Sequence, residues 1–437
     1  MKRLLLGALF LFAAPVWGVT ALDIGFACDE SVQNVTSATY IDAADTLVFT
    51  PGATADFIII AHASVETSNA DTAYSIQLNH DSGTGSGVVW EYDTDQLLPF
   101  TGAQDHYGSI WNFLDQRNLD NASHTFSIEV KRTAGTGNVE VENVCIVALE
   151  KSANAEYAEQ LTLQDTGTST VNVTMMSLTF TATAEEYVIF QASHFGQELD
   201  SANRQGIEFV LSGGQEFCID STMRRDGNDE AADPSPILVG HSVGCLATET
   251  LAAGSVTFIL QAEGDGIAGE MFMQRGAIFA MPSAEFESFY GVEATAESAR
   301  FNVAPVQDDS GLGSITQTLA AQTHLMALTV GSSNESANDA PGTSSYCLID
   351  VDGTDHSDMR FPGDRDEDQN NYYNNWVLWA ETFASSASRT VKSQCASSLA
   401  GGNNQAAFNN RRLIVAEIPA DAGGAPRRRI SVTIGAD

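Results

Sequence analysis

The chain has 437 residues, and its 57 acidic residues against 20 basic ones give a net charge of −37. A surface this acidic repels nucleic-acid phosphates and anionic lipid headgroups, so we expect neither as a partner. The length is enough for about two to four domains.

Residues 1–21 have the pattern of a secretory signal peptide. Lys2 and Arg3 precede an apolar run from Leu4 to Val16, and small residues suited to cleavage follow up to Ala21. The run is shorter than the ~20 residues that a membrane-spanning helix needs, although an uncleaved anchor is the alternative. We therefore expect a secreted protein or one on an extracellular surface, with no membrane span once the leader is removed.

One β-rich segment occurs three times, about 130 residues apart. An apolar run recurs at 56–64, 186–194 and 323–333, and a pair of strand-like runs recurs at 124–150, 255–282 and 388–419. A repeat of this length is a whole domain, so the chain reads as three copies of one module. We expect modules at 22–152, 153–292 and 293–420, between the leader at 1–21 and a basic tail at 421–437.

Within each module the dominant period is two. Phe126, Ile128 and Val130, for example, alternate with polar neighbours, as a strand with one buried and one wet face must. Short strands and frequent turn residues are typical of a two-sheet sandwich. The predicted fold class is therefore all-β, with three tandem antiparallel β-sandwich domains that are jelly-roll-like, while an immunoglobulin-like topology remains an alternative.

Helix-like composition is confined to the joints between modules. Residues 153–161 and 283–290 mix alanine, glutamate and aromatic residues at helical spacing, so they are predicted to form short helical connectors, or else extended linkers. Flexible glycine- or proline-rich linkers are absent from these joints, so the modules are expected to form a semi-rigid rod.

Six cysteines remain after the leader, two in each module, and an even count in an exported chain favours disulfides. Zinc binding is the weaker alternative, because no C-x-x-C spacing occurs. The predicted pairs, each within one module, are Cys28 with Cys145, Cys218 with Cys245, and Cys347 with Cys395.

The segment from Gly240 to Gly244 matches G-x-S-x-G, the pattern of the hydrolase nucleophile elbow. An elbow needs a following helix, but only ten residues separate this segment from the next strand-like run at Ser255. We therefore assign no catalytic role to Ser242 and name no catalytic residue in the chain.

Alternating carboxylates in the third module could supply the oxygen ligands that calcium requires. The candidate residues are Asp350, Asp352, Asp355, Asp364, Asp366 and Asp368. The second part of this run departs from an EF-hand loop, because Gln369 stands where glycine is needed and Asn375 where glutamate is needed. Solvated acidic loops are the competing interpretation, and calcium would be structural.

Trp111 and Trp376 stand two repeat lengths apart, so they are expected to hold equivalent positions. Equivalent placement favours packing under the central loop. With Trp379, they would instead form a platform for sugar rings if they were exposed on one ridge.

The tail at 421–437 contains three arginines, 427–429, followed by Ile430 to Ile434, which alternate like a strand. This run is predicted either to fold back as an extra edge strand on the third module or to add to the sheet edge of a neighbouring molecule.

Taken together, these patterns predict a noncatalytic, secreted structural or adhesive protein of a cell surface or extracellular assembly. Repetition builds length without building a cleft, and the tail offers an element for self-association. The alternatives are a carbohydrate-binding protein that uses its sandwich loops on cell-surface glycan, then a secreted hydrolase, and then a virion structural protein, against which the leader argues.

Overall fold

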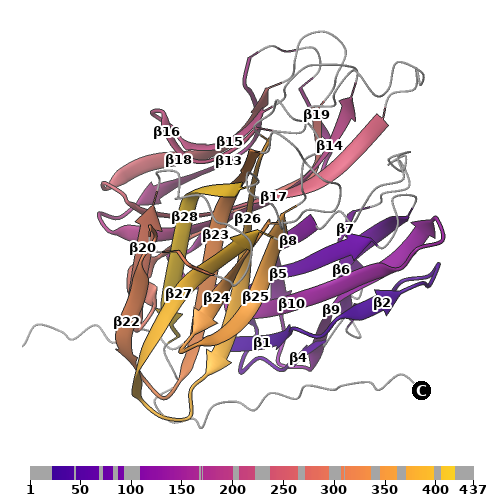
Figure 1. Ribbon diagram of the computed structural model, residues 1–437. Coiled ribbons are helices and arrows are strands. Elements are labelled where there is room, and N and C mark those ends of the chain that lie inside the picture. The colour runs from indigo at the N-terminus through magenta and orange to yellow at the C-terminus, as the bar shows by residue number, and fades with distance from the viewer. Residues whose placement is uncertain are drawn as a thin grey trace, which may run out of the picture.

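The computed structural model describes residues 22–43, 46–67, 72–81, 87–92, 109–166, 169, 171–199, 206–221, 237–263, 271–294, 307–309, 311–335, 345–361, 371–397 and 405–418 (Figure 1). These residues form six antiparallel sheets, which fall in chain order into three groups of two. We call the groups the first, second and third sandwich. The predicted leader, 1–21, and the tail from 421 lie outside the described residues.

In each sandwich, one sheet contains the predicted apolar strand, and we call it the inner sheet. In the first sandwich the inner sheet has the order β1 (Ile24–Asp29), β10 (Val139–Glu150), β5 (Ala55–Thr67), β8 (Ser109–Leu119). In the second the order is β11 (Glu156–Gln160), β19 (Met271–Pro282), β14 (Glu186–Leu199), β17 (Ile237–Thr250). In the third it is β20 (Ser288–Ala294), β28 (Gln405–Glu417), β23 (Thr323–Glu335), β26 (Asn371–Thr382). The short strands β2 (Gln33–Val35) and β12 (Gln164–Asp165) pair with β10 and β19.

We call the second sheet of each sandwich the outer sheet. In the first sandwich the outer sheet has the order β3 (Ile41–Asp42), β9 (His124–Ala134), β6 (Ala73–Asp81), β7 (Gly87–Tyr92). In the second the order is β13 (Val173–Ala182), β18 (Gly254–Glu263), β15 (Gly206–Leu211), β16 (Gln215–Ser221). In the third it is β21 (Gln307–Asp308), β27 (Ala387–Ser397), β24 (Ser345–Val351), β25 (Thr354–Phe361). Here β4 (Leu47–Phe49) and β22 (Ser314–Leu319) pair with β9 and β27.

The strand order is that of a jelly roll. Numbering the eight main strands of a sandwich along the chain, the inner sheet runs first, eighth, third, sixth and the outer sheet second, seventh, fourth, fifth. This arrangement contains two Greek keys, whereas an immunoglobulin sandwich divides its strands differently between its sheets. The predicted all-β, jelly-roll-like fold class is confirmed.

The central strands of the inner sheets are buried on both faces, whereas strands of the outer sheets are buried on one. Nine consecutive residues of β5, Phe57 to Val65, are buried, whereas β13 alternates between buried and exposed positions over most of its length. One face of an inner sheet packs on its own outer sheet, and the other packs on a neighbouring sandwich. A strand without a wet face carries a continuous apolar run, which explains why the three repeated runs do not alternate.

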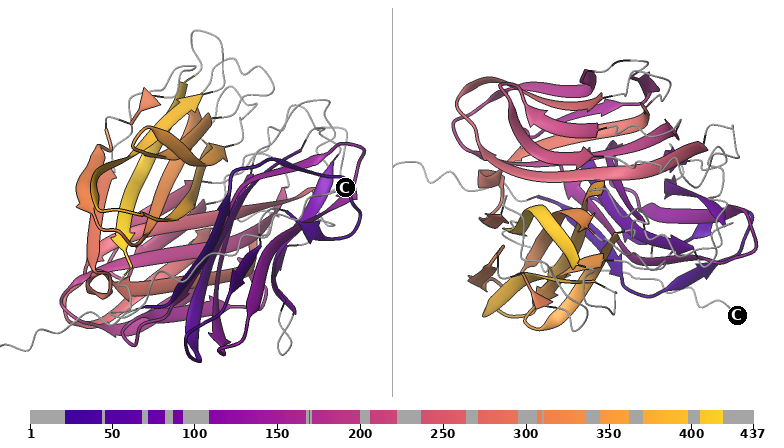
Figure 2. Two further views of the ribbon diagram at one scale, coloured as in Figure 1. Left: turned by 90° about the horizontal axis from the view of Figure 1, so that it is seen from below. Right: turned by 45° about the horizontal axis from the view of Figure 1, so that its top comes forward.

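The three sandwiches surround a common centre rather than forming a rod (Figure 2). The edge strands β8, β17 and β26 of the inner sheets contact one another there. The expected rod is therefore wrong. The reason is the apolar second face of each inner sheet, which would remain in water if the sandwiches were joined end to end.

The two predicted helical connectors are also wrong. In the first joint, Glu156–Gln160 form strand β11, which pairs with β19. In the second joint, Ser288–Ala294 form strand β20, which pairs with β28. The helical structure described at these joints is one 3-10 turn, Ser283–Glu285. Segments this short form marginal helices alone, so a sheet edge that satisfies their backbone outcompetes the helix. Because β20 belongs to the third sandwich, the expected boundary at 292 falls inside a strand.

The three predicted disulfides are present. Cys28–Cys145 and Cys347–Cys395 each join neighbouring strands of one sheet, whereas Cys218–Cys245 joins β16 of an outer sheet to β17 of an inner sheet. None of the helical structure in the described ranges is long and apolar enough to cross a membrane.

Candidate functional site

The central strands meet at a buried polar junction, which we define by Asn112 on β8, Ser242 on β17 and Trp376 on β26. All three are at most 4% exposed. The backbone N–H of Asn112 donates to the Ser242 hydroxyl at 2.9 Å, and the Asn112 side-chain amide donates to the Trp376 carbonyl at 2.7 Å. The Trp376 N–H donates back to Asn112 Oδ1 at 3.3 Å. One asparagine thus connects all three sandwiches.

Two histidines and a glutamine extend the junction. His194 Nε2 lies 3.0 Å from the Asn112 carbonyl, the Trp376 indole N–H donates to the Gln191 carbonyl at 3.0 Å, and the Leu378 N–H donates to His62 Nδ1 at 3.2 Å. Burial lowers the pKa of His62 to about 3, so this imidazole is neutral at physiological pH. The two histidine side chains satisfy backbone groups that the edge strands β8 and β26 would otherwise leave unpaired inside the protein.

The G-x-S-x-G segment is part of this junction. It lies within β17 and not at a turn between a strand and a helix, and Ser242 is buried with its hydroxyl bonded to Asn112. A Cβ on Gly244 would stand 2.1 Å from Asn112 Oδ1 and 2.8 Å from Trp376 Cδ1. Glycine is therefore required here for close approach of the three sandwiches.

Two of the three tryptophans of the predicted sugar platform are inaccessible. Trp111 and Trp376 are 1% and 0% exposed. Trp111 donates its indole N–H to the Tyr74 hydroxyl at 2.8 Å, and the Trp376 ring packs edge-on against Phe190 of the second sandwich. The platform expectation is wrong for these two residues, because Trp111 packs against the outer sheet of its own sandwich and Trp376 packs against the second sandwich.

Trp379, the third residue of that platform, is partly exposed where the third sandwich meets the first. His356 stacks on it with the ring centroids 4.1 Å apart and the planes 14° apart. His356 Nδ1 in turn lies 2.9 Å from Glu30 Oε1, just beyond β1. Glu381 Oε2 accepts from the Trp379 indole at 3.5 Å. The indole thus has one face covered by His356 and one carboxylate, that of Glu381, at its N–H.

The described carboxylates of the predicted calcium set are bound to other protein groups. Asp352 accepts from Arg389 and from the Thr390 N–H, both at 2.8 Å, and Asp350 accepts from the Gly353 N–H at 3.1 Å. Burial and the Asp350 carboxylate raise the pKa of Asp355. Among described residues, no three His, Cys, Asp or Glu side chains are placed to hold a metal. Asp364, Asp366 and Asp368 lie outside those residues, so calcium stays a prediction that thermal melting with and without a chelator would test.

A charged cluster lies between the first and second sandwiches. Asp115 on β8 is 2% exposed and accepts from Arg117 Nε at 2.5 Å, while Arg275 Nη2 on β19 lies 3.8 Å from its other oxygen. Burial raises the pKa of Asp115 to about 6, against the opposing effect of both arginines. Burial and the neighbouring carboxylates also raise the pKa of Tyr157, whose hydroxyl donates to Glu159 at 3.2 Å.

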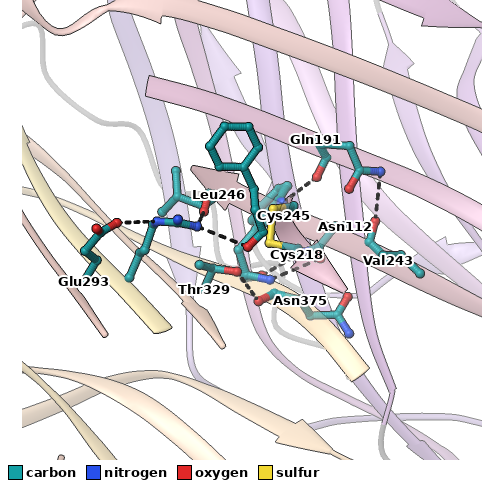
Figure 3. Close-up of a disulfide and its surroundings, with 12 residues drawn as sticks. Asn112, Gln191, Cys218, Val243, Cys245, Leu246, Glu293, Thr329 and Asn375 are labelled. Carbon is teal, nitrogen blue, oxygen red and sulfur yellow. Dashed lines mark hydrogen bonds and ion pairs between the residues drawn. A yellow bond between two sulfur atoms is a disulfide. The ribbon is translucent and has the colours of Figure 1, made fainter. Parts of the chain in front are cut away.

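Arg412 on β28 joins the third sandwich to the second beside the disulfide Cys218–Cys245, which Figure 3 shows with Leu246 and Glu293. Its Nη1 donates to the carbonyls of Phe217 at 3.4 Å and Leu246 at 3.3 Å, and its Nε to Glu293 at 3.0 Å. Phe217 and Leu246 directly adjoin Cys218 and Cys245 in sequence. The disulfide therefore fixes the two carbonyls that the guanidinium binds, although they belong to different sheets.

The sequence predicted the disulfides correctly but gave no prediction of the junction, and Trp379 as a glycan contact stays a prediction. The signal was present in the apolar runs, because His62, Gln191 and His194 interrupt strands that are otherwise apolar on both faces. Polar side chains on such strands need buried partners. Those partners lie on other sandwiches, so the repeat alone could not identify them.

Comparisons with known proteins identify no family. No family model matches the chain, and no curated protein matches it. Among solved structures, PNGF-II is similar over 84% of this chain and 100% of its own, with 9% identity and a TM-score of 0.30. The insecticidal delta-endotoxin Cry8Ea1 from Bacillus thuringiensis is similar over 89% of this chain and 60% of its own, with 9% identity and a TM-score of 0.21. A triple jelly-roll protein of an archaeal virus is similar over 91% and 92%, with 10% identity and a TM-score of 0.17. Likenesses this distant carry no functional argument.

Proposed function

We propose that the protein is a noncatalytic structural or adhesive component of a cell surface or extracellular assembly. The observation that carries this proposal is the Asn112 junction, which bonds three sandwiches into one body. The side chains of Asn112, Ser242 and His194 are all directed at backbone groups of neighbouring sandwiches. Polar groups used in this way supply rigidity, which suits a building block or a display platform.

The disulfides and the leader support an extracellular location. Three disulfides are compatible with an extracellular protein, because such bonds persist in oxidising compartments. Residues 1–21 supply the export signal in this proposal. The strongly acidic composition keeps such a body soluble while it is transported.

Self-association through the tail completes the proposal. Residues 421–437 combine a basic run with a strand-like run in a chain of net charge −37, so the tail is attracted to other copies. The test is size-exclusion chromatography with light scattering, and electron microscopy, of the leaderless protein with and without calcium. Oligomers or filaments would support assembly, whereas monomers at all concentrations, without attachment to cells, would contradict it.

A second candidate function, carbohydrate binding, is favoured by the Trp379 site. Its partly exposed indole lies beside Glu381 and under the ring of His356, which in turn contacts Glu30. A glycan array probed with wild type, Trp379→Ala and Trp379→Phe would test it. Sugar stacking predicts loss of signal for alanine and retention for phenylalanine. Equal signals from all three proteins would exclude this site.

A further inference from the structure

One sheet edge of the second sandwich is long and uncharged, and no second strand pairs with it among the residues that the structure describes. β13 (Val173–Ala182) is the end strand of its outer sheet and contains neither a charged residue nor proline (Figure 1). Within the described part of the chain, β18 is its ladder partner. An edge of this kind presents a row of backbone donors and acceptors to any strand that can pair with it.

The corresponding edges elsewhere are shorter or carry charges. The equivalent strands of the other outer sheets are β3 and β4, with two and three residues, and β21 and β22, with two and six. On the inner sheets, the edge strand β11 contains Glu156 and Glu159, and β20 contains Glu293. Short length and charge are the usual protections of an edge, and β13 has neither.

Exposed apolar side chains gather beside this edge. The described residues include four exposed large hydrophobic side chains, and three of them are Leu161, Leu163 and Val171. All three lie on the connection from β11 to β13, two strands that contact each other and that each end the strand order of their sheet. Apolar side chains grouped next to an unpaired strand are typical of a surface that is covered by a partner.

We propose that Ile430 to Ile434 of a second copy of this chain add to β13 as an antiparallel strand. This inference rests on the proposed assembly and names its acceptor. Eleven residues, 419–429, lie between Ile418, the last described residue, and Ile430, and such a segment can extend ~40 Å, enough to leave its own molecule. The run alternates β-branched apolar residues with Ser431 and Thr433, as an added strand with one buried face requires.

The pattern of β13 and the charges around it specify a register. Leu178, Phe180 and Ala182 are buried, whereas Thr179 and Thr181 are exposed. Antiparallel pairing of Ile434, Val432 and Ile430 with those buried positions continues both faces of the sheet. The arginines that precede Ile430 then lie beyond the end of β13, where Glu185 and Glu186 follow. Opposite charges therefore meet at the point where the added strand begins.

Size measurement on four leaderless proteins tests the acceptor. They are wild type, a variant truncated after Ile418, Ser177→Lys with Thr181→Lys on β13, and Thr316→Lys with Thr318→Lys on β22. All four substituted positions are exposed, so the β22 variant is a matched control. Lysine on the acceptor strand repels the incoming arginines. We expect oligomers for wild type and the β22 variant, and at least a tenfold weaker association for the truncated and β13 variants, with unchanged melting temperatures.

The outcomes separate this inference from the proposed function. Oligomers that persist in the β13 variant would overturn β13 as acceptor while assembly stands. Oligomers that persist after truncation would show that copies associate without the tail, for example by pairing of β13 with β13. That result would also overturn the proposal that Ile430 to Ile434 add to β13. A monomeric wild type, with the tail folded on its own molecule, would overturn both.

A cysteine pair tests the register directly. Thr179 and Thr433 are directly opposite in it and face the same side, so Thr179→Cys in one chain and Thr433→Cys in another are expected to form an intermolecular disulfide when mixed and oxidised. Thr316→Cys on β22 replaces Thr179→Cys in the control mixture. Equal cross-linking in both mixtures would refute the register.

Discussion

The side-chain amide of Asn112 donates to the carbonyl of Trp376 at 2.7 Å, although 264 positions separate the two residues in sequence. The bond joins the first sandwich to the third, and the Ser242 hydroxyl adds the second. Four predictions follow from this packing and from the interfaces around it.

Asn112→Ala removes the side chain that serves both the carbonyl and the N–H of Trp376. We expect the free energy of unfolding to fall by about 2 kcal/mol or more, because each buried backbone group left unsatisfied costs about 1–3 kcal/mol. Urea unfolding measures this. Asn118→Ala on the same strand, where the side chain is exposed, is the control and should change stability by less than about 0.5 kcal/mol. Similar losses in the two variants would contradict the role of Asn112.

Gly244→Ala places a methyl group against Asn112 and Trp376, at distances that no real Cβ tolerates. The expected loss is about 1–3 kcal/mol, the usual cost of overpacking a buried site. Gly291→Ala on β20 is the matched control, because its nearest neighbour would be 3.7 Å away. Thermal unfolding of the two variants should therefore differ. If Gly244→Ala melts like wild type, the sandwiches do not approach as described.

The Asp115 cluster predicts a pH dependence of stability. Burial raises the pKa of Asp115 to about 6 in the folded protein, above the value of about 3.9 in an unfolded chain. Between these two pKa values the folded state holds a proton on Asp115 that the unfolded chain has lost. The contribution of this proton to the free energy of unfolding is therefore complete below about pH 4 and is lost as the pH rises through about 6. Arg117, Arg275, Glu159 and Tyr157 face this carboxyl.

Asp115→Asn removes that titration. From about pH 4 to about pH 6, the free energy of unfolding of wild type should fall by roughly 3 kcal/mol relative to that of the variant, because each pH unit between the two pKa values changes it by about 1.4 kcal/mol. Urea midpoints at several pH values give the comparison. Glu263→Gln, an exposed carboxylate of the second sandwich, controls for the change in net charge. Parallel pH curves for wild type and Asp115→Asn would rule the effect out.

Arg412→Lys tests the contact between the second and third sandwiches. Lysine lacks the planar fork that reaches the Phe217 and Leu246 carbonyls together, so we expect a loss of about 1–3 kcal/mol. Arg389→Lys is the control: its guanidinium pairs with the exposed Asp352, so the substitution should lower the free energy of unfolding by less. In a double-mutant cycle, replacing Cys218 and Cys245 by alanine should shrink the effect of Arg412→Lys, because the carbonyls are then no longer fixed. Additive effects would argue against that coupling.

The sequence by itself determined the strands, their assignment to repeated sandwiches and the cysteine pairs. Period-two alternation and turn residues are local properties, and a repeat preserves the position of each cysteine within its copy. The two helical connectors were predicted wrongly because local composition does not show which strand a segment pairs with. Glu156–Gln160 and Ser288–Ala294 resemble short helices, but neighbouring strands offered their backbone groups complete ladders.

Only the tertiary structure decided how the sandwiches meet and which side chains are thereby used. Trp376, Ser242 and Asn112 are remote in the chain, and their contact depends on three apolar sheet faces leaving water together. The hydrophobic effect has no direction, so a continuous apolar run specifies that both faces of a strand are buried but not against which partner. Shape and hydrogen bonding at the junction make that choice, and they exist only when all three sandwiches are folded.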